Sequence, residues 1–547
     1  MDFKLKLQKL LEQQLKTQVV IETPPSLEFG DFAVHSYKLK HKPEDLKAKL
    51  KLSSFIQKTE IKGPYLNFFL KKELFAKETI KEILKKKSKY GSEKSKKQTI
   101  VIDYSSPNIA KPFSIAHLRS TAIGNSIQRI SEKLGYKVIG INHLGDWGTQ
   151  FGKLIYAYKT WGSEKELKKD PIQHLLNIYI KLHEEAKLKP ELDEEGKKWF
   201  VKLEKGDASA KKLWKIFTTL SLKEFNKIYK KLGIKFTHTT GESFYEPLLD
   251  PTIKFLEKKN LVKEDQGALV VHLEQFNMPP CILKKSDDAS IYGLRDIAAA
   301  IYRYNKFKFS RMFYIVDSRQ ALHFQQFFKV LELANYSFSS LLEHVNFGTM
   351  HFEEGVMSTR EGKVVFMEDV LSQTESKVLK IIKQKNPTLK NKDKVAQQVA
   401  IGAIIFWDLS HDRVKDIDFS WEKLLDFQGE TGPYIQYTNA RALSILENQK
   451  TIKSDFSKLS TKQEIALINH LSIYNETINQ SFNNLKPSTL AHYLIILAQL
   501  FNEFYSECPV RSADEKVKAA RIKLVKSVSF VLENGLSLLG IETPKEM

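Results

Sequence analysis

Two segments of this chain carry side chains that suit the binding of phosphate groups. Residues 105–121 read SSPNIAKPFSIAHLRST and place Lys111 and His117 among hydroxyl and amide side chains. Residues 357–365 read MSTREGKVV and put hydroxyls and cations on one short loop: Ser358, Thr359, Arg360 and Lys363. Taken alone, a histidine at a helix start is more often structural, and a four-letter string has many chance matches. Together and in this order, the two segments predict a nucleotide site.

The elements around the first segment favour this interpretation. A strand-like apolar run, residues 99–102, comes before it, and a helix-like run follows. One face of that helix is apolar, with Leu118, Ala122, Ile123, Ile127 and Ile130. A strand, a turn rich in Ser, Pro and Asn, and then a helix is how an open parallel sheet presents an anion site. We therefore expect His117 to lie at the carboxyl edge of such a sheet.

The rest of the chain divides into three parts. Residues 1–88 indicate a small α+β unit, and the Lys-rich run 85–97 is predicted to be a linker. In residues 98–370, strand-like runs (99–102, 137–141 and 312–316) alternate with helical patterns, which predicts a doubly wound parallel sheet. A helical stretch, 164–232, predicts an insertion at about 160–245. Residues 371–547, with a core at about 429–547, are predicted to be helical. The last helix carries one apolar stripe: Ile522, Val525, Val528, Leu532, Leu536 and Leu539.

The composition sets limits on the partners. The formal net charge is +21, from 86 basic and 65 acidic residues, which favours a polyanionic partner such as nucleic acid. Solvated lysines on every face explain the same number equally well. The two cysteines, Cys281 and Cys508, form no CxxC pattern, so we expect neither a disulfide framework nor a metal site. The sequence shows no bilayer-length apolar run and no signal peptide, and we expect a cytoplasmic protein.

The two phosphate-binding segments resemble the ATP signatures of class I aminoacyl-tRNA synthetases, and their wording resembles the arginyl family. Further segments extend this resemblance over the whole chain: HLGDWGTQFGKL (143–154), LEKGD (203–207), GESFY (241–245), SIYGLRDIAAAIYR (290–303) and LHFQQFF (322–328). The resemblance implies a Rossmann-like catalytic domain with a helical insertion. It also implies an additional α+β domain at the N-terminus and an all-α helical bundle that binds the anticodon.

The ATP site implied by the resemblance departs from the general class I pattern. Ser114 stands where the first histidine is usual, and Ala116 where a glycine is usual. The second signature lacks its usual second lysine, and Lys111 is thought to compensate. The implied catalytic residues are Lys111, Ser114, His117, Arg360 and Lys363. The implied ATP contacts are Pro107, Ala116, His117, Gly348, Met357, Ser358 and Thr359.

The resemblance also implies a pocket for arginine. Bidentate acceptors are the expected partners of a planar guanidinium. Asp296 and Glu242 would bind it, Tyr292 would shape the pocket, and Asp103, Asn108 and Gln320 would surround the α-amino end. His143 and Trp147 are expected near the site. Without the resemblance, Asp296 could form a surface ion pair with Arg295, and Glu242 could cap a helix or turn.

Single-stranded RNA is the implied ligand of the C-terminal part. Residues 429–446 offer Tyr434, Tyr437, Asn439 and Arg441 for stacking and hydrogen bonding to unpaired bases. The two tyrosines could equally pack a helix junction. In the N-terminal part, Phe29, Phe32 and Asn67 are candidates for contact with the tRNA elbow.

The activity implied is that of a monomeric arginyl-tRNA synthetase. It would use ATP with Mg²⁺, L-arginine and tRNA(Arg), would need tRNA for the activation step, and would have no editing domain, no bound structural metal and no membrane partner. Two alternatives stay open. A synthetase for glutamate is disfavoured by the acids Asp296 and Glu242, and one for cysteine by the lack of zinc-type cysteines. Ser114 and Ala116 are the strongest support for an inactive paralogue that binds RNA, and the presence of Lys111, His117, Arg360, Asp296 and Gln320 argues against it.

Overall fold

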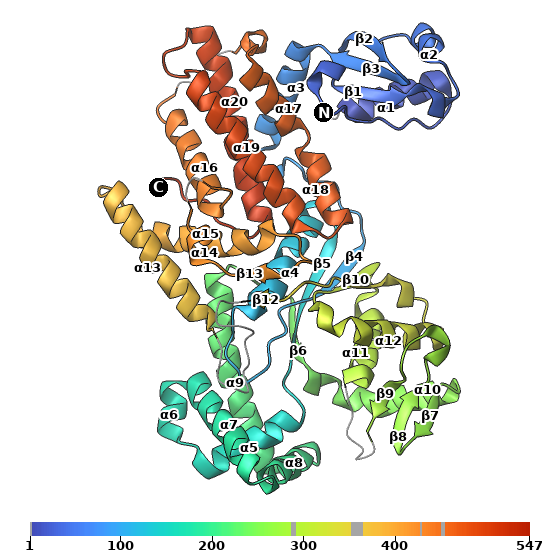
Figure 1. Cartoon of the computed structure of the whole chain (residues 1–547), viewed down its shortest axis with the longest axis vertical. Coiled ribbons are helices and arrows are strands. Elements are labelled where there is room, and N and C mark those ends of the chain that lie inside the picture. The colour runs from blue at the N-terminus through green and yellow to red at the C-terminus, as the bar shows by residue number, and fades with distance from the viewer. Residues whose placement is uncertain (1–2, 286–291, 352–364, 427–428, 450–453) are drawn as a thin grey trace.

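The computed structural model of the 547-residue chain describes residues 3–285, 292–351, 365–426, 429–449 and 454–547 (Figure 1). Within these ranges, no helix combines the length and the apolar character that a membrane span requires.

A five-stranded parallel sheet forms the centre of the molecule (Figure 1). Its strands are β4 (Thr99–Asp103), β5 (Lys137–Leu144), β6 (His238–Gly241), β10 (Arg311–Tyr314) and β11 (Leu342–His344). Their order is β11-β10-β4-β5-β6, and each neighbouring pair is parallel. After β4, the chain adds β5 and β6 on one side of this strand, and it later adds β10 and β11 on the other side. A crevice is expected at the carboxyl ends of β4 and β10, where the direction of winding reverses. The prediction of a doubly wound parallel sheet is confirmed.

Helix α4 (Ala116–Lys133) follows β4 and packs its apolar face on the sheet. Leu118, Ala122, Ile123, Ile127 and Ile130 are all buried, as their spacing predicts. Burial of this face fixes the helix, and with it the position of its first turn at the carboxyl edge of β4.

The excursion from β5 to β6 is a helical unit that differs in extent from the predicted insertion. Its helices are α5 (Thr149–Trp161), α6 (Glu164–Lys169), α7 (Pro171–Leu188), α8 (Glu191–Glu204) and α9 (Ala208–Lys231). Helix α5 belongs to it because α5 packs on α8 at a close crossing, where a Cβ on Gly152 would lie 2.1 Å from the carbonyl oxygen of Gly196. Residues 238–241 form β6 of the central sheet. The bounds 160–245 were therefore wrong at both ends.

A second excursion, from β6 to β10, carries a small antiparallel sheet that the sequence did not predict. It comprises η4 (Glu242–Leu248), α10 (Leu249–Lys258), β7 (Val262–Asp265), β8 (Ala268–Val271), η5 (Glu274–Phe276), β9 (Cys281–Lys284) and α11 (Tyr292–Phe307). The connection from β10 to β11 contains η6 (Ser318–Gln320), α12 (Ala321–Leu333) and η7 (Ser339–Leu341). Helices α11 and α12 lie side by side, so residues from both excursions reach one region.

The C-terminal part is a helical bundle, with one short strand pair at its base. Its elements are β12 (Met350–His351), α13 (Met367–Lys385), α14 (Lys392–Ser410), β13 (Ile417–Asp418), α15 (Trp421–Leu424), α16 (Gly432–Leu446), η8 (Phe456–Lys458), α17 (Lys462–Ser472), α18 (Tyr474–Asn483), α19 (Pro487–Glu507) and α20 (Glu515–Leu538). The stripe on α20 is buried, with Ile522 partly exposed. The predicted boundary at 370/371 falls inside α13.

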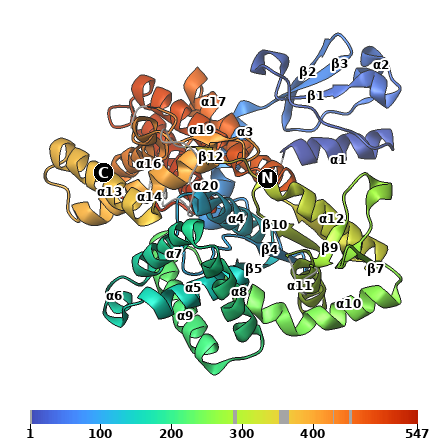
Figure 2. The ribbon, with the colours of Figure 1, turned by 60° about the horizontal axis from the view of Figure 1, so that its bottom comes forward.

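The N-terminal unit is an antiparallel sheet with helices, set apart from the central parallel sheet (Figure 2). It contains α1 (Phe3–Leu15), η1 (Leu27–Phe29), β1 (Phe32–His35), η2 (Ser36–Leu39), α2 (Pro43–Lys49), β2 (Ile56–Lys62) and β3 (Tyr65–Leu70). The next helix, α3 (Lys72–Lys86), packs instead on α17 and α20 of the bundle.

The run 85–97, predicted to be a linker, contacts the bundle and the central domain. After η3 (Lys87–Lys89), Tyr90 is buried, stacks on Tyr474 with ring centroids 5.7 Å apart, and donates a hydrogen bond to the carbonyl of Leu471. The main-chain N–H of Lys96 donates to Gly135. Contacts distant in sequence therefore hold this lysine-rich run in place.

Candidate functional site

The first turn of α4 holds His117 in one orientation. The main-chain N–H of Ser114 donates to Nδ1 of His117 over 3.0 Å, and Oγ of Ser114 lies 3.0 Å from the same nitrogen. Burial, together with the nearby Lys111, lowers the pKa of His117 to about 4. The ring is therefore neutral near neutral pH, and since Nδ1 accepts, Nε2 carries the proton. His117 can donate a hydrogen bond to a phosphate oxygen.

The loop between β4 and α4 is strained. Ser105, Ser106 and Ala110 have φ values of +73°, +49° and +60°, which side-chain-bearing residues adopt rarely. Such strain persists where surrounding contacts fix it, and it gathers at functional sites. Here Ser105 is fixed by hydrogen bonds with the hydroxyls of Ser120 and Thr121 on α4. The loop is thus fastened to the helix that carries His117.

The two unusual residues of the first signature have different surroundings. Ser114 is buried and supplies the contacts to His117, so it orients that ring. Ala116 is exposed at the start of α4 and leaves a small surface there. Pro107 is buried, and its carbonyl accepts from Gly145. Lys111 is half-buried, with Nζ 5.9 Å from the ring centroid of Tyr179 on α7.

The remaining predicted ATP contacts are placed only in part. Gly348 is buried, its N–H donates to Arg413, and its carbonyl accepts from Arg119. A Cβ at Gly348 would lie 2.5 Å from the main chain of Lys415, so this position requires glycine for packing. Its contact with ATP stays a prediction. Met357, Ser358, Thr359, Arg360 and Lys363 lie outside the described residues.

The two acids predicted to bind the guanidinium interact electrostatically: the charge of Asp296 affects the ionisation of Glu242. Glu242 is buried at the start of η4, directly after β6, and Asp296 is half-buried on α11. Burial, reinforced by the charge of Asp296 and opposed by Arg295, raises the pKa of Glu242 to about 8. Arg295 pairs with Glu246, Nε to Oε1 at 2.8 Å, and not with Asp296. The alternative of an Arg295–Asp296 surface pair is therefore wrong. A buried acid with a strongly raised pKa marks a candidate functional site.

Asp103, at the end of β4, already has protein partners. Its Oδ2 lies 2.7 Å from Nη1 of the fully buried Arg303, and its Oδ1 accepts from Oγ of Ser106 over 2.9 Å. Sequence reasoning did not identify Arg303 as the partner of Asp103, because the two residues are 200 positions apart. The role of Asp103 at the α-amino end stays a prediction, now with Arg303 as its neighbour.

Three other predicted arginine contacts lie at the surface of the same edge. Asn108 and Gln320 are exposed, and Tyr292 is 66 % exposed at the start of α11. Asn108 lies against Gly145. A Cβ added to Gly145 would be 2.0 Å from Oδ1 of Asn108. Exposure leaves these side chains accessible to a ligand.

His143 and Trp147, after β5, each bury a nitrogen that has no hydrogen-bond partner within the described residues: Nδ1 of His143 and Nε1 of Trp147. The indole of Trp147 packs edge-on against Trp214 and Phe200, with both centroid distances 5.9 Å. An unsatisfied buried donor or acceptor is costly, so these atoms suit a bound polar group or water.

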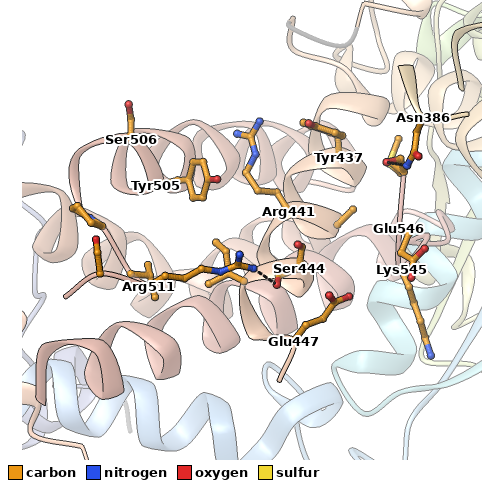
Figure 3. Close-up of a pocket in the computed structure, with 16 residues that line it drawn as sticks. Asn386, Tyr437, Arg441, Ser444, Glu447, Tyr505, Ser506, Arg511, Lys545 and Glu546 are labelled. Atoms are coloured by element: carbon orange, nitrogen blue, oxygen red, sulfur yellow. Dashed lines mark hydrogen bonds between the residues drawn. The ribbon is translucent and has the colours of Figure 1, made fainter. Parts of the chain in front are cut away.

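The bundle contains a cavity of about 860 Å³ between α16, α19 and the C-terminal residues (Figure 3). Tyr437 and Arg441 of α16 line it, and the guanidinium carbon of Arg441 lies 5.0 Å from the ring centroids of both Tyr437 and Tyr505. Arg511 lines it too and donates to the carbonyl of Ser444 over 3.1 Å. Sequence reasoning missed Tyr505 and Arg511, which lie far from the motif along the chain.

Two residues predicted to contact RNA have structural roles instead. Asn439 has an exposed fraction of 0 %, and its Oδ1 accepts from Oγ of Ser529 over 2.8 Å. The prediction that Asn439 contacts RNA is therefore wrong, because it faces α20 inside the bundle. Tyr434 is half-buried, and its hydroxyl accepts from Nδ2 of Asn502 over 2.9 Å, which agrees with packing at a helix junction.

In the N-terminal unit, a second cavity of about 310 Å³ is lined by Phe29, Lys62, Tyr65 and Asn67. Nζ of Lys62 lies 3.6 Å from the ring centroid of Phe29. Phe32 is half-buried and packs on the core of this unit.

Comparisons with known proteins agree over the whole chain. Three family descriptions match: tRNA synthetases class I (R), catalytic domain, at residues 79–421; DALR anticodon binding domain at 435–547; and arginyl tRNA synthetase N terminal domain at 2–70. The chain is 47 % identical to an arginine–tRNA ligase of Clostridium botulinum and 45 % identical to one of Alkaliphilus metalliredigens, each over 100 % of both chains.

A solved structure shows the same likeness in three dimensions. The arginyl-tRNA synthetase of Thermus thermophilus has a TM-score of 0.85 with this chain at 26 % identity, covering 100 % of both chains. The structure of the Plasmodium falciparum arginyl-tRNA synthetase shares the fold, with a TM-score of 0.81 at 24 % identity. With the catalytic-domain description matched over residues 79–421 and 45–47 % identity to arginine–tRNA ligases over the full chain, this chain belongs to the arginyl-tRNA synthetases of class I.

Proposed function

We propose that the chain activates L-arginine with ATP and transfers it to the 3′ end of tRNA(Arg), releasing AMP and pyrophosphate. The observation that carries this most directly is the pair Glu242 and Asp296. They put two acids at the carboxyl edge of the sheet, and the pKa of Glu242 is raised by burial next to Asp296. A guanidinium would satisfy both.

The first step is attack of an arginine carboxylate oxygen on the α-phosphate of ATP, with the bond to the β-phosphate breaking. ATP enters as a substrate together with its Mg²⁺ ion. His117 would donate from Nε2 to a phosphate oxygen, and the cations of the second signature, Arg360 and Lys363, would clamp the leaving pyrophosphate. Donors held in place before reaction stabilise developing charge at little reorganisation cost.

The second step transfers the arginyl group. A hydroxyl of the terminal ribose of tRNA attacks the carbonyl carbon of the arginyl adenylate, and AMP leaves. The bundle cavity lined by Tyr437, Arg441 and Arg511 supplies aromatic and cationic surfaces of the kind that bind unpaired bases. We propose that this cavity contacts the anticodon loop, and that activation requires bound tRNA.

Selectivity follows from the shape of the acceptors. Lysine has the charge of arginine but lacks its fork, and would leave acceptors of Glu242 and Asp296 unpaired. A site built on such hydrogen bonds rejects the poorer ligand by about 10⁴-fold. A carboxylate side chain such as glutamate would be repelled.

The test is a charging assay. The purified protein is incubated with ATP, total tRNA and each labelled amino acid in turn, and acid-precipitable label is counted. Label from arginine alone is the expected result. Binding of tRNA without any charging would instead support an inactive RNA-binding paralogue, an alternative that the matched arginine–tRNA ligases do not favour. Pyrophosphate exchange with and without tRNA tests the requirement for tRNA. The cytoplasmic location and the monomeric state stay predictions.

A further inference from the structure

His323 is in direct contact with the acid predicted to bind arginine. It lies in the first turn of α12, and its Nε2 is 2.6 Å from Oδ2 of Asp296 on the neighbouring helix α11. The imidazole is held by two aromatic neighbours, Phe324 and Phe327, each with its ring centroid 5.4 Å away. The histidine therefore has little freedom to leave the carboxylate.

The contact uses only one of the two carboxylate oxygens. Within the described part of the chain, Oδ1 of Asp296 receives no hydrogen bond. A carboxylate with one oxygen fixed and the other open has a set orientation and a remaining acceptor. This is the geometry that a positioned guanidinium receptor needs.

The pKa values of Glu242 and Asp296 shift in opposite directions, and the contact with His323 distinguishes the two acids. Burial raises the pKa of Glu242 to about 8, and no described side chain donates a hydrogen bond to it. Burial also acts on Asp296, but the hydrogen bond from His323, with the charges of His323, His143 and Arg303, holds its pKa below the ordinary value. Together with burial, the charge of Asp296 in turn raises the pKa of Cys281, Tyr314 and Glu242. Without its donor, Asp296 would lose the largest of the interactions that lower its pKa.

We propose that His323 is a positioning residue for arginine: its Nε2–H orients the carboxylate of Asp296 before the substrate arrives. This inference rests on the proposed function. His323 acts through Asp296 and needs no contact with arginine itself. A merely structural role, in which His323 only fastens α12 to α11, predicts lower stability with unchanged arginine binding.

The test compares three substitutions in the full-length protein. His323→Gln places an amide nitrogen near the position of Nε2, so the donor is kept. His323→Asn places its amide near Nδ1 instead, and His323→Leu removes the donor. For each, the KM and kcat of charging are measured for arginine, together with the KM for ATP and the Kd for tRNA.

The expected result is a rise in the arginine KM of at least about 10-fold for the Leu and Asn variants near neutral pH, since a hydrogen bond to a charged group is lost. That rise should shrink as the pH increases, because a higher pH favours the ionised carboxylate. The Gln variant should stay within about threefold of the parent, and the values for ATP and tRNA should not change.

The same assay distinguishes a failure of the role proposed for His323 from a failure of the proposed function. If the parent charges arginine, two results would overturn the role of His323. One is an arginine KM that is equal in the Gln, Asn and Leu variants, and the other is a fall in kcat alone. Failure of the parent to charge arginine would overturn the proposed function itself. If the Leu variant does not fold, the comparison of Gln with Asn still decides the matter, because both are polar.

Discussion

Arg119 and Asp408 form a buried ion pair, with Nε 2.9 Å from Oδ1 and both side chains at most 1 % exposed. Arg119 lies two residues after His117 on α4, and Asp408 lies near the end of α14. The guanidinium also donates to the carbonyls of Gly348, Lys415 and Arg413. One side chain thus joins the helix of the ATP signature, the segment before the second signature, and the helical bundle.

Arg119→Met should strongly destabilise the protein. It would leave Asp408 ionisable, buried and unpaired, and three carbonyls would lose a donor, at a cost of about 3–5 kcal/mol. The matched control is Arg319→Met, since Arg319 pairs with Asp317 at 2.9 Å but its side chain is 69 % exposed, and its loss should cost at most about 1 kcal/mol. Urea denaturation followed by circular dichroism measures both. Similar losses of unfolding free energy in the two variants would show that the buried pair contributes no more to stability than the exposed one.

Arginine binding should release a proton near neutral pH. The pKa of Glu242 is raised to about 8 in the free protein, mainly by burial, and a bound guanidinium would lower it. The bound state therefore holds fewer protons, so affinity should rise with pH up to about 8 and level off above it. Calorimetry in two buffers of different ionisation enthalpy counts the protons. Glu242→Gln should abolish the release; heats that do not depend on the buffer in the parent would contradict the assignment.

Replacement of His117 should affect activation through Nε2. His117→Ala should slow tRNA-dependent pyrophosphate exchange by about 10²–10³-fold, the usual loss for one preorganised donor, with a smaller change in arginine affinity. His117→Gln, which offers a nitrogen near Nε2, should retain more activity than His117→Asn, which mimics Nδ1. An Asn variant as active as the Gln variant would mean that the donor is not Nε2.

Tyr437→Ala should weaken tRNA binding without changing the arginine KM. Tyr437 is 41 % exposed beside the bundle cavity, and loss of one stacking surface costs about 1–3 kcal/mol. Phe276→Ala, at an aromatic residue of η5 that is 36 % exposed, is the control and should leave tRNA affinity unchanged. A filter-binding titration measures both. By contrast, Asn439→Ala should lower stability, since Asn439 is buried against Ser529.

Local patterns predicted the parts of this molecule that local forces determine. The strand-like runs predicted at residues 99–102 and 137–141 lie in β4 and β5, and the apolar face of α4 follows from helical spacing, which the chain shows within a short window. The alternation of strands and helices predicted a doubly wound parallel sheet, but it predicted neither the strand order nor β6, which fell inside the expected insertion. The small β7–β8–β9 sheet was missed because its four-residue strands carry little periodic signal.

Pairings distant in sequence could not be predicted in this way. Arg303 and Asp103 meet only because α11 lies against the end of β4, and His323 reaches Asp296 only because α12 lies against α11. Neither contact leaves a trace in the spacing of nearby residues. Likewise, Asn439 looks like an RNA-reading residue in its motif, and only the packing of α16 on α20 shows that it is enclosed.

The position of α3 decides where this chain can be divided. Helix α3 follows the N-terminal sheet in sequence but covers α17 and α20, burying Ile80 and Ile83. A protein that begins at residue 98 would expose that surface of the bundle to water. A graft that exchanges the N-terminal unit for that of a relative should therefore be joined at Lys71, between β3 and α3, and not in the basic run that follows.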